Sequence, residues 1–67
     1  MLKNGTADGK GHVWNLVKVG KYWANVDPTW CMPLLSDKFY KKASHNWDSS
    51  LYPKATYNKA TDYRLYL

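Results

Sequence analysis

The sequence lacks several features that commonly stabilise or locate a small protein. Cys31 is the single cysteine among 67 residues, so no disulfide can form within the chain. One thiol together with His12 and His45 also falls short of the four Cys or His ligands of a structural zinc site. No apolar run approaches the ~20 residues of a membrane span, and no apolar segment of a secretory signal follows Met1. Stability must therefore come from a packed core or from another chain.

Glutamate is also absent, and the net charge is +5. A basic chain suits an anionic polymer such as nucleic acid or a cell-wall glycan. The lysines are scattered singly apart from Lys41-Lys42, which is typical of an ordinary solvated surface, so nucleic acid is not the expected partner. A basic aromatic module that binds a polymer remains the alternative function. One unpaired cysteine leaves the compartment open.

Aromatic residues are abundant, with four Trp, six Tyr and one Phe. Each of these side chains can bury roughly 150–250 Å², which favours a folded core over a disordered chain. The clearest local pattern is a β-hairpin over residues 12–27, in which two segments rich in strand-forming residues flank Val19-Gly20. With a two-residue turn there, Lys18 faces Lys21 and His12 faces Asp27. Because side chains alternate, one face carries His12, Trp14, Leu16, Trp23, Asn25 and Asp27.

The rest of the chain gives weaker signals. The glycines of residues 1–11 predict a flexible lead-in, Pro28 ends the hairpin, and residues 28–36 and 44–56 read as irregular segments. Ser36-Asp37 is a helix-start signal for a short helix near 37–43, and the alternation over residues 61–67 predicts a final strand. We therefore expect an α+β fold, with a small antiparallel β-sheet built on the 12–27 hairpin and one short helix.

His12 and Asp27 are the candidate catalytic pair. Cross-strand neighbours have Cβ atoms about 4.5–5.5 Å apart, close enough for a carboxylate to accept a hydrogen bond from an imidazole. A catalytic triad uses such a pair to orient its base and to stabilise the imidazolium. The pair still requires a thiol or hydroxyl at the other ring nitrogen. Facing His and Asp residues are more often an ordinary surface pair, so the spacing alone does not establish catalysis.

Several motifs in order resemble the transglutaminase-like family, whose catalytic domain has a papain-like cysteine fold. They are His12-Val13-Trp14-Asn15, Val26-Asp27-Pro28-Thr29-Trp30, Ser36-Asp37, His45-Asn46-Trp47-Asp48 and Tyr52-Pro53-Lys54-Ala55. The resemblance covers residues 11–56 and looks like the bacterial type. It implies that residues 12–67 form part of such a domain, that His12 and Asp27 match the catalytic His and Asp, and that the parent enzyme acts on a polypeptide.

The chain departs from the family at the nucleophile. The family order is Cys, His, Asp, with the Cys at a helix N-terminus, yet none of the eleven residues before His12 is cysteine. We therefore expect a truncated or degenerate domain that is inactive alone. The face bearing His12 would lack its covering helix and would leave two Trp and a Leu in water. This predicts a homo-oligomer, or a partner that is the missing Cys-bearing half, unless residues 1–11 or 31–56 fold over the face.

Two other readings involve single residues. Cys31 could replace the nucleophile, but it follows Asp27 and Pro28 and would need a sharp reversal to reach His12, so an idle thiol fits better. His45 could join His12, Asp27 and Asp48 around a metal, but no tight ligand spacing is present. The resemblance implies a structural role for His45, and we expect neither a metal nor another cofactor.

Overall fold

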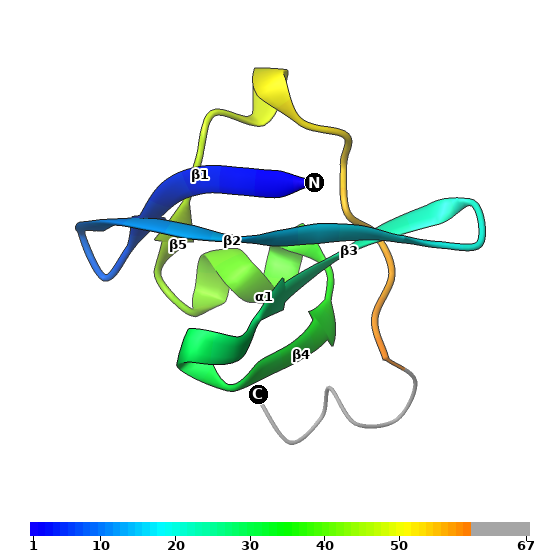
Figure 1. Cartoon of the computed structure of the whole chain (residues 1–67), viewed down its shortest axis with the longest axis horizontal. Helices are drawn as coiled ribbons and strands as arrows, with labels where there is room; N and C mark the ends of the chain where they lie inside the picture. Colours follow the sequence, from blue (N-terminus) through cyan, green and yellow to red (C-terminus); the bar gives the residue numbers. More distant parts are fainter. Residues whose placement is uncertain (60–67) are drawn as a thin grey trace.

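The computed structural model describes residues 1–59, which form a curled five-stranded antiparallel sheet, a half-barrel, with one short helix (Figure 1). The strands are β1 (Leu2–Ala7), β2 (Lys10–Val19), β3 (Tyr22–Asp27), β4 (Met32–Leu35) and β5 (His45–Asn46), and their order in the sheet is β4-β3-β2-β1-β5. The helix is α1 (Asp37–Lys42), with single 3-10 turns at Pro28–Trp30 and Ser49–Leu51. The expected small antiparallel sheet and short helix are confirmed, and the described chain is mostly β with little helix.

The prediction that residues 1–11 form a flexible lead-in is wrong for the segment that becomes β1. Leu2–Ala7 pairs with β2 along its whole length, from Leu2 opposite Asn15 to Ala7 opposite Lys10. Asp8 and Gly9 form the two-residue turn, with φ values of 53° and 78°. An Asp-Gly pair is a strong hairpin signal because both turn positions require positive φ. Gly9 therefore belongs to a defined turn between β1 and β2.

The β2–β3 hairpin forms as predicted, but its turn lies one residue further along, at Gly20-Lys21. Val19 pairs with Tyr22 and Leu16 with Asn25, so the register is shifted by two residues from the predicted one. Gly20 has φ 62° and occupies the first turn position, where glycine relieves the strain of positive φ. A shift of two leaves every side chain on its predicted face, because the side-chain period of a strand is two.

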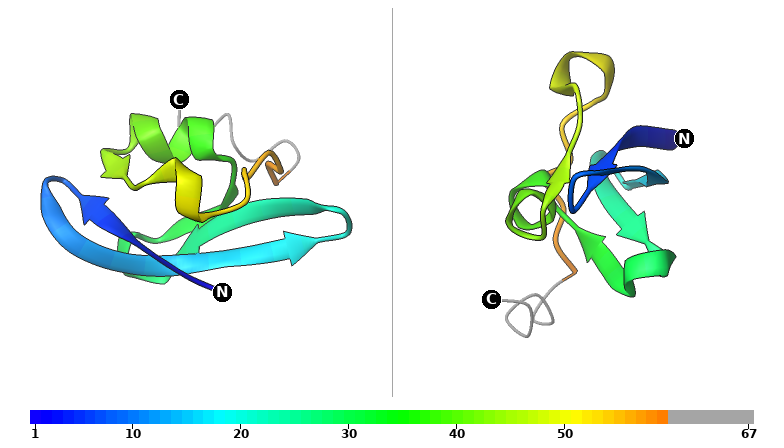
Figure 2. Two further views of the ribbon diagram at one scale, coloured as in Figure 1. Left: turned by 90° about the horizontal axis from the view of Figure 1, so that it is seen from above. Right: turned by 90° about the vertical axis from the view of Figure 1, so that its left-hand side faces the viewer.

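Helix α1 lies across the inner face of the curled sheet, as the view from above shows (Figure 2). Ser36 is its N-cap residue, as the sequence predicts. Phe39 and Tyr40 from α1 pack with Trp14 and Leu35 to form the core. Trp14 is 1% and Leu16 0% exposed. Residues 31–56 thus cover Trp14 and its neighbours on the inner face, so the expectation that this face would stand bare is wrong. The self-association expected from a bare face stays a prediction.

Segments predicted to be irregular contain two short strands. β4 adds to the edge of β3, and β5 pairs with β1 at the opposite edge, with Ala7 opposite His45. A Cβ at Gly5 would overlap the backbone oxygen of Asn46 and lie 2.9 Å from Trp14 Cη2, so glycine is needed for this close approach. The strand predicted over residues 61–67 lies outside the described residues. Within residues 1–59, no helix is long and apolar enough to cross a membrane.

Candidate functional site

Asp27 is fixed by the way β3 ends. Pro28 cannot donate to the strand ladder, and the chain leaves the sheet in the 3-10 turn Pro28–Trp30. Asp27 caps this turn, with Oδ1 accepting a hydrogen bond from the backbone N–H of Trp30 at 3.3 Å. Only 1% of Asp27 is exposed. The cap holds the carboxylate in one orientation and leaves Oδ2 for other donors.

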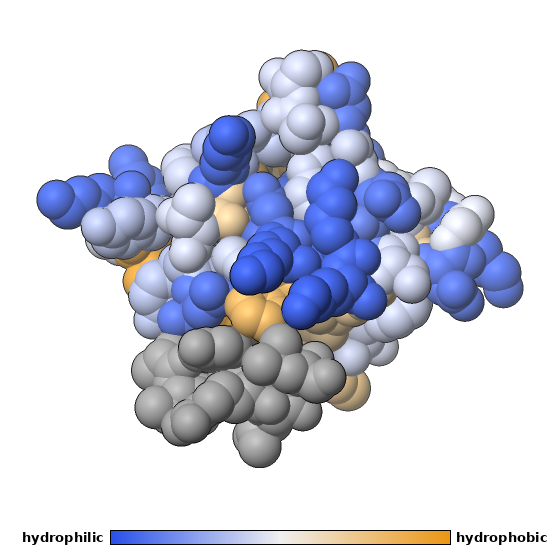
Figure 3. Space-filling view, turned by 180° about the vertical axis from the view of Figure 1, so that it is seen from behind, coloured by the Kyte–Doolittle hydropathy of each residue, from blue (hydrophilic) through white to orange (hydrophobic). Residues whose placement is uncertain are grey.

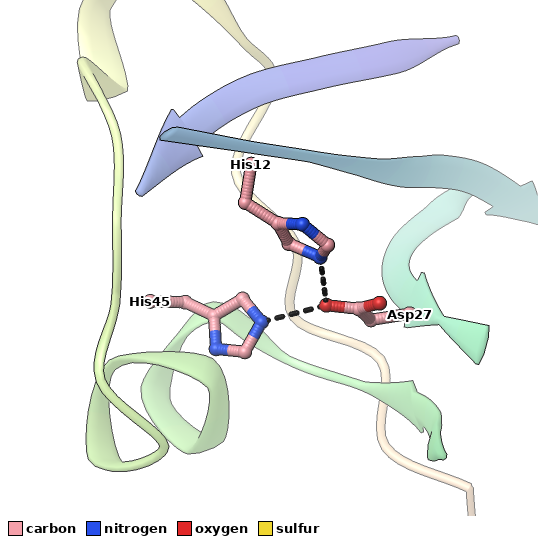
Figure 4. Close-up of side chains that lie close together, drawn as sticks. All are labelled: His12, Asp27 and His45. Atoms are coloured by element: carbon pink, nitrogen blue, oxygen red, sulfur yellow. Dashed lines mark hydrogen bonds and ion pairs between the residues drawn. The ribbon is translucent and has the colours of Figure 1, made fainter. Parts of the chain in front are cut away.

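Nε2 of His12 lies 2.8 Å from Oδ2 of Asp27 (Figure 4). The predicted side-chain contact is therefore confirmed, although the two residues are not directly opposite. In the observed register they are diagonal neighbours on one face, which long side chains can still bridge. The His12 side chain is 18% exposed, and the hydrogen bonds of residues 1–59 give Nδ1 no partner. One ring nitrogen of His12 is thus committed to Asp27 and the other is open.

The sequence did not predict that His45 would join this pair. Its side chain is fully buried, and Nε2 lies 2.8 Å from the same Asp27 oxygen that His12 contacts. Nδ1 faces the backbone oxygen of Ala43 at 2.9 Å. Ser44, with φ 60°, turns the chain from α1 into β5, and the β1–β5 pairing fixes His45 on the inner face. The three side chains meet from three different strands (Figure 4).

The hydrogen-bond partners determine the protonation of the cluster. Burial alone would raise the pKa of Asp27, but hydrogen bonds from His45, His12 and the Trp30 N–H outweigh it and hold that pKa below its ordinary value. The ionised carboxylate accepts from both histidines. Because a carbonyl oxygen can only accept, Nδ1 of His45 must donate to Ala43. Both nitrogens of His45 thus face acceptor oxygens, an arrangement that a ring with two N–H groups satisfies fully.

Aromatic rings enclose His45 on several sides. The rings of Trp14, Trp30 and Tyr40 have centroids 4.9–5.0 Å from the His45 ring, all in edge-type geometries. Burial and the negative charge of Asp27 raise the pKa of Tyr40, which stays a neutral phenol and donates to the Pro33 carbonyl. Water is therefore excluded from the His45 side of the cluster, which strengthens the charged hydrogen bonds there.

Other residues considered as site members lie elsewhere. Asp48 is exposed and caps the turn Ser49–Leu51 by accepting from Ser50. Cys31 is exposed, in a left-handed conformation with φ 55° after Trp30, and no hydrogen bond of the described residues joins its sulfur to a histidine. His12, Asp27 and His45 are therefore brought together, while Asp48 and Cys31 are not part of the cluster.

A second buried network fixes α1 against the sheet. Lys3 is completely buried, and its Nζ donates to Asn25 Oδ1 and Asp37 Oδ1, both at 2.9 Å. Asn25 in turn donates to Asp37 and accepts from the indole N–H of Trp14. Burial lowers the pKa of Lys3, and the adjacent Asp37 carboxylate partly offsets this. The ammonium also lies 3.7 Å from the Trp47 ring. This network holds Trp14 beside His45.

The aromatic residues are divided between core and surface. Trp14 and Tyr40 are buried, while Trp30 and Tyr22 are 40% and 52% exposed. Trp30 lines an apolar hollow with Met32, Leu35, Phe39, Lys42 and Ala43. Hydrophilic residues spread across the back of the molecule beside a smaller apolar area (Figure 3). Burial of Trp14 and Tyr40 removes these two rings from any surface that could stack on sugars or bases.

No protein-family model, curated protein or solved structure matches this chain.

Proposed function

We propose that this chain supplies the histidine and the carboxylate of a cysteine-dependent acyl-transfer site of the transglutaminase-like type. The carrying observation is the 2.8 Å contact between His12 Nε2 and Asp27 Oδ2, with Nδ1 of His12 left open. In this proposal the curled antiparallel sheet corresponds to the β half of such a domain. The nucleophilic thiol belongs to a Cys-bearing segment outside these 67 residues.

The three side chains take distinct roles in such a site. Nδ1 of His12 accepts the thiol proton and later returns a proton to the leaving group. Asp27 keeps the His12 proton on Nε2 and stabilises the imidazolium once Nδ1 is protonated. His45 does not touch the substrate and acts as a positioning residue, because its hydrogen bond fixes the oxygen that His12 uses.

The Cys-bearing segment is also the partner that we propose. His12 is the member of the cluster with a partly exposed ring, so a thiol can approach it from that side. Self-association is less favoured than the sequence alone suggests, because Trp14 and Leu16 are already covered within the chain. The substrate class that follows from the resemblance is a polypeptide, attacked at an amide carbonyl.

The test joins the Cys-bearing half of a bacterial transglutaminase-like domain to the N-terminus of this chain. We expect the chain alone to show no turnover of a glutamine-amide substrate. In the fused protein, we expect the supplied thiol to react with iodoacetamide near neutral pH faster than a free thiol, because a paired imidazole increases the thiolate fraction. His12→Gln should remove this acceleration.

Cys31→Ser is the matched control, since Cys31 is exposed and outside the cluster. It should leave the alkylation rate of the supplied thiol unchanged. An equal rate in the fused protein and its His12→Gln variant would contradict the proposal. Turnover by the chain alone that disappears in Cys31→Ser would instead make Cys31 the nucleophile.

A further inference from the structure

The His12–Asp27–His45 cluster has the atoms of a metal site as well as those of a catalytic pair. The ligand-capable atoms, Nε2 of both histidines and Oδ2 of Asp27, lie within 4.8 Å of one another. Two imidazoles and one carboxylate, with no thiolate, are donors that suit zinc and its neighbours in the first transition series. Calcium and magnesium prefer oxygen ligands. The donor set therefore favours a transition-metal ion.

The groups behind the ligands are arranged as in a metal centre. A histidine that binds metal through one nitrogen usually donates its other N–H to a carbonyl or carboxylate, which fixes the ring. His45 has this arrangement, with Nδ1 2.9 Å from the Ala43 oxygen. The second oxygen of Asp27 is likewise held, by the Trp30 N–H. Two of the three ligands are thus oriented by backbone groups, with their remaining atoms directed into the cluster.

Access and geometry are compatible with one ion. His45 and Asp27 are buried, while the His12 side chain is 18% exposed and marks the open side. Ligand atoms of a tetrahedral zinc ion lie about 3.3 Å apart, given bonds of about 2.0–2.1 Å. The adjustment needed is on the order of 1 Å and falls mainly on the His12 ring, the least constrained ligand. Water would complete the coordination at the open side.

We propose that His12, Asp27 and His45 bind one zinc ion, which replaces the protons that the two Nε2 atoms direct at Asp27. This site does not require the proposed acyl transfer, although it uses the same residues. A zinc ion on Nε2 displaces the hydrogen bond between His12 and Asp27. In an enzyme completed by a thiol, zinc would therefore inhibit, because it would replace the hydrogen bond by which Asp27 orients His12.

The test is titration of the untagged chain with Zn²⁺ by calorimetry and with Co²⁺ by visible absorption. We expect one ion per chain and the intense absorption bands of four-coordinate cobalt. His12→Gln should weaken Zn²⁺ binding by at least about 100-fold, because a ligand counts for more than the 10–100-fold attributed to outer-shell groups. His12 is on the open side, so this variant should keep the circular dichroism of the parent chain.

Cys31→Ser and His45→Gln complete the experiment. Cys31→Ser should bind as the parent does, and no sulfur-to-cobalt charge-transfer band should appear. His45→Gln should also lose binding, and the His12→Gln result stands if this buried substitution prevents folding. Failure of the parent chain to bind Zn²⁺ at millimolar concentration, undiminished binding by His12→Gln, or loss of binding in Cys31→Ser would each overturn the proposal. None of these outcomes alters the thiol-alkylation test of the proposed function.

Discussion

Replacing Asp27 with asparagine is expected to lower the free energy of unfolding by about 3–5 kcal/mol, the usual cost of removing one partner from a buried ion pair. Asp27 is 1% exposed and accepts from two histidines through a single oxygen. The asparagine carries no charge, so its oxygen is a weaker acceptor for the two histidines than the carboxylate is. If the NH₂ group of the asparagine takes the place of Oδ2, it faces His12 and His45 as a donor instead of accepting from them. A domain of this size has about 3–5 kcal/mol in total, so the variant should be largely unfolded.

Urea denaturation followed by tryptophan fluorescence measures this loss. Asp48→Asn is the matched control, because Asp48 is exposed and interacts with Ser50 at the start of a 3-10 turn. Its effect should be small, because asparagine caps a helical turn about as well as aspartate does. Similar midpoints for Asp27→Asn and Asp48→Asn would show that the buried cluster does not contribute as described.

Replacing Lys3 with methionine is expected to lower the free energy of unfolding by about 2–3 kcal/mol. This is the usual cost of removing a charged hydrogen-bond partner from a largely buried network. Methionine keeps the length of the side chain and most of its apolar packing. It removes the ammonium that contacts Asn25, Asp37 and the Trp47 ring. The Asp37 side chain is 24% exposed and keeps its other donors, so the loss should be smaller than for Asp27.

A double-mutant cycle separates the ion pair from the rest of the network. Lys3→Met combined with Asp37→Asn should be less destabilised than the sum of the two single variants, because the second change removes the unpaired charge. Lys10→Met serves as a control on an exposed residue of β2 and should stay within about 0.5 kcal/mol. Additive effects of Lys3→Met and Asp37→Asn would contradict the close pairing of the two side chains.

The contact between His12 and Asp27 could be predicted because a strand has a side-chain period of two. The observed turn lies one residue after the predicted one, and the observed register differs from the predicted register by two residues. His12 and Asp27 nevertheless lie on the inner face. An error of one residue in register would have separated them. The face on which a side chain lies was thus predicted correctly although the residue opposite it was not. For β1 the signal is the Asp8-Gly9 turn, because its inward residues Lys3, Gly5 and Ala7 show no apolar alternation.

His45 could not be placed from local pattern. It is 18 residues from Asp27, and its position depends on β5 pairing with β1, a contact that requires Gly5 beside Asn46. No local pattern in the sequence indicates that Gly5 and Asn46 lie side by side. The covering of Trp14 likewise depends on the tertiary packing of α1 and β4, which the hairpin pattern does not contain. Both features arise from contacts between distant segments.

The most direct test of the central claim is the protonation of the two histidine rings, measured by nitrogen-15 NMR of the imidazoles with a chelator present. We predict that His45 carries protons on both nitrogens. We also predict that neutral His12 keeps its proton on Nε2, hydrogen-bonded to Asp27, with a bare Nδ1 available to a thiol. Neutral His12 with its proton on Nδ1, or a His45 ring lacking its Nε2 proton, would contradict the account of this site.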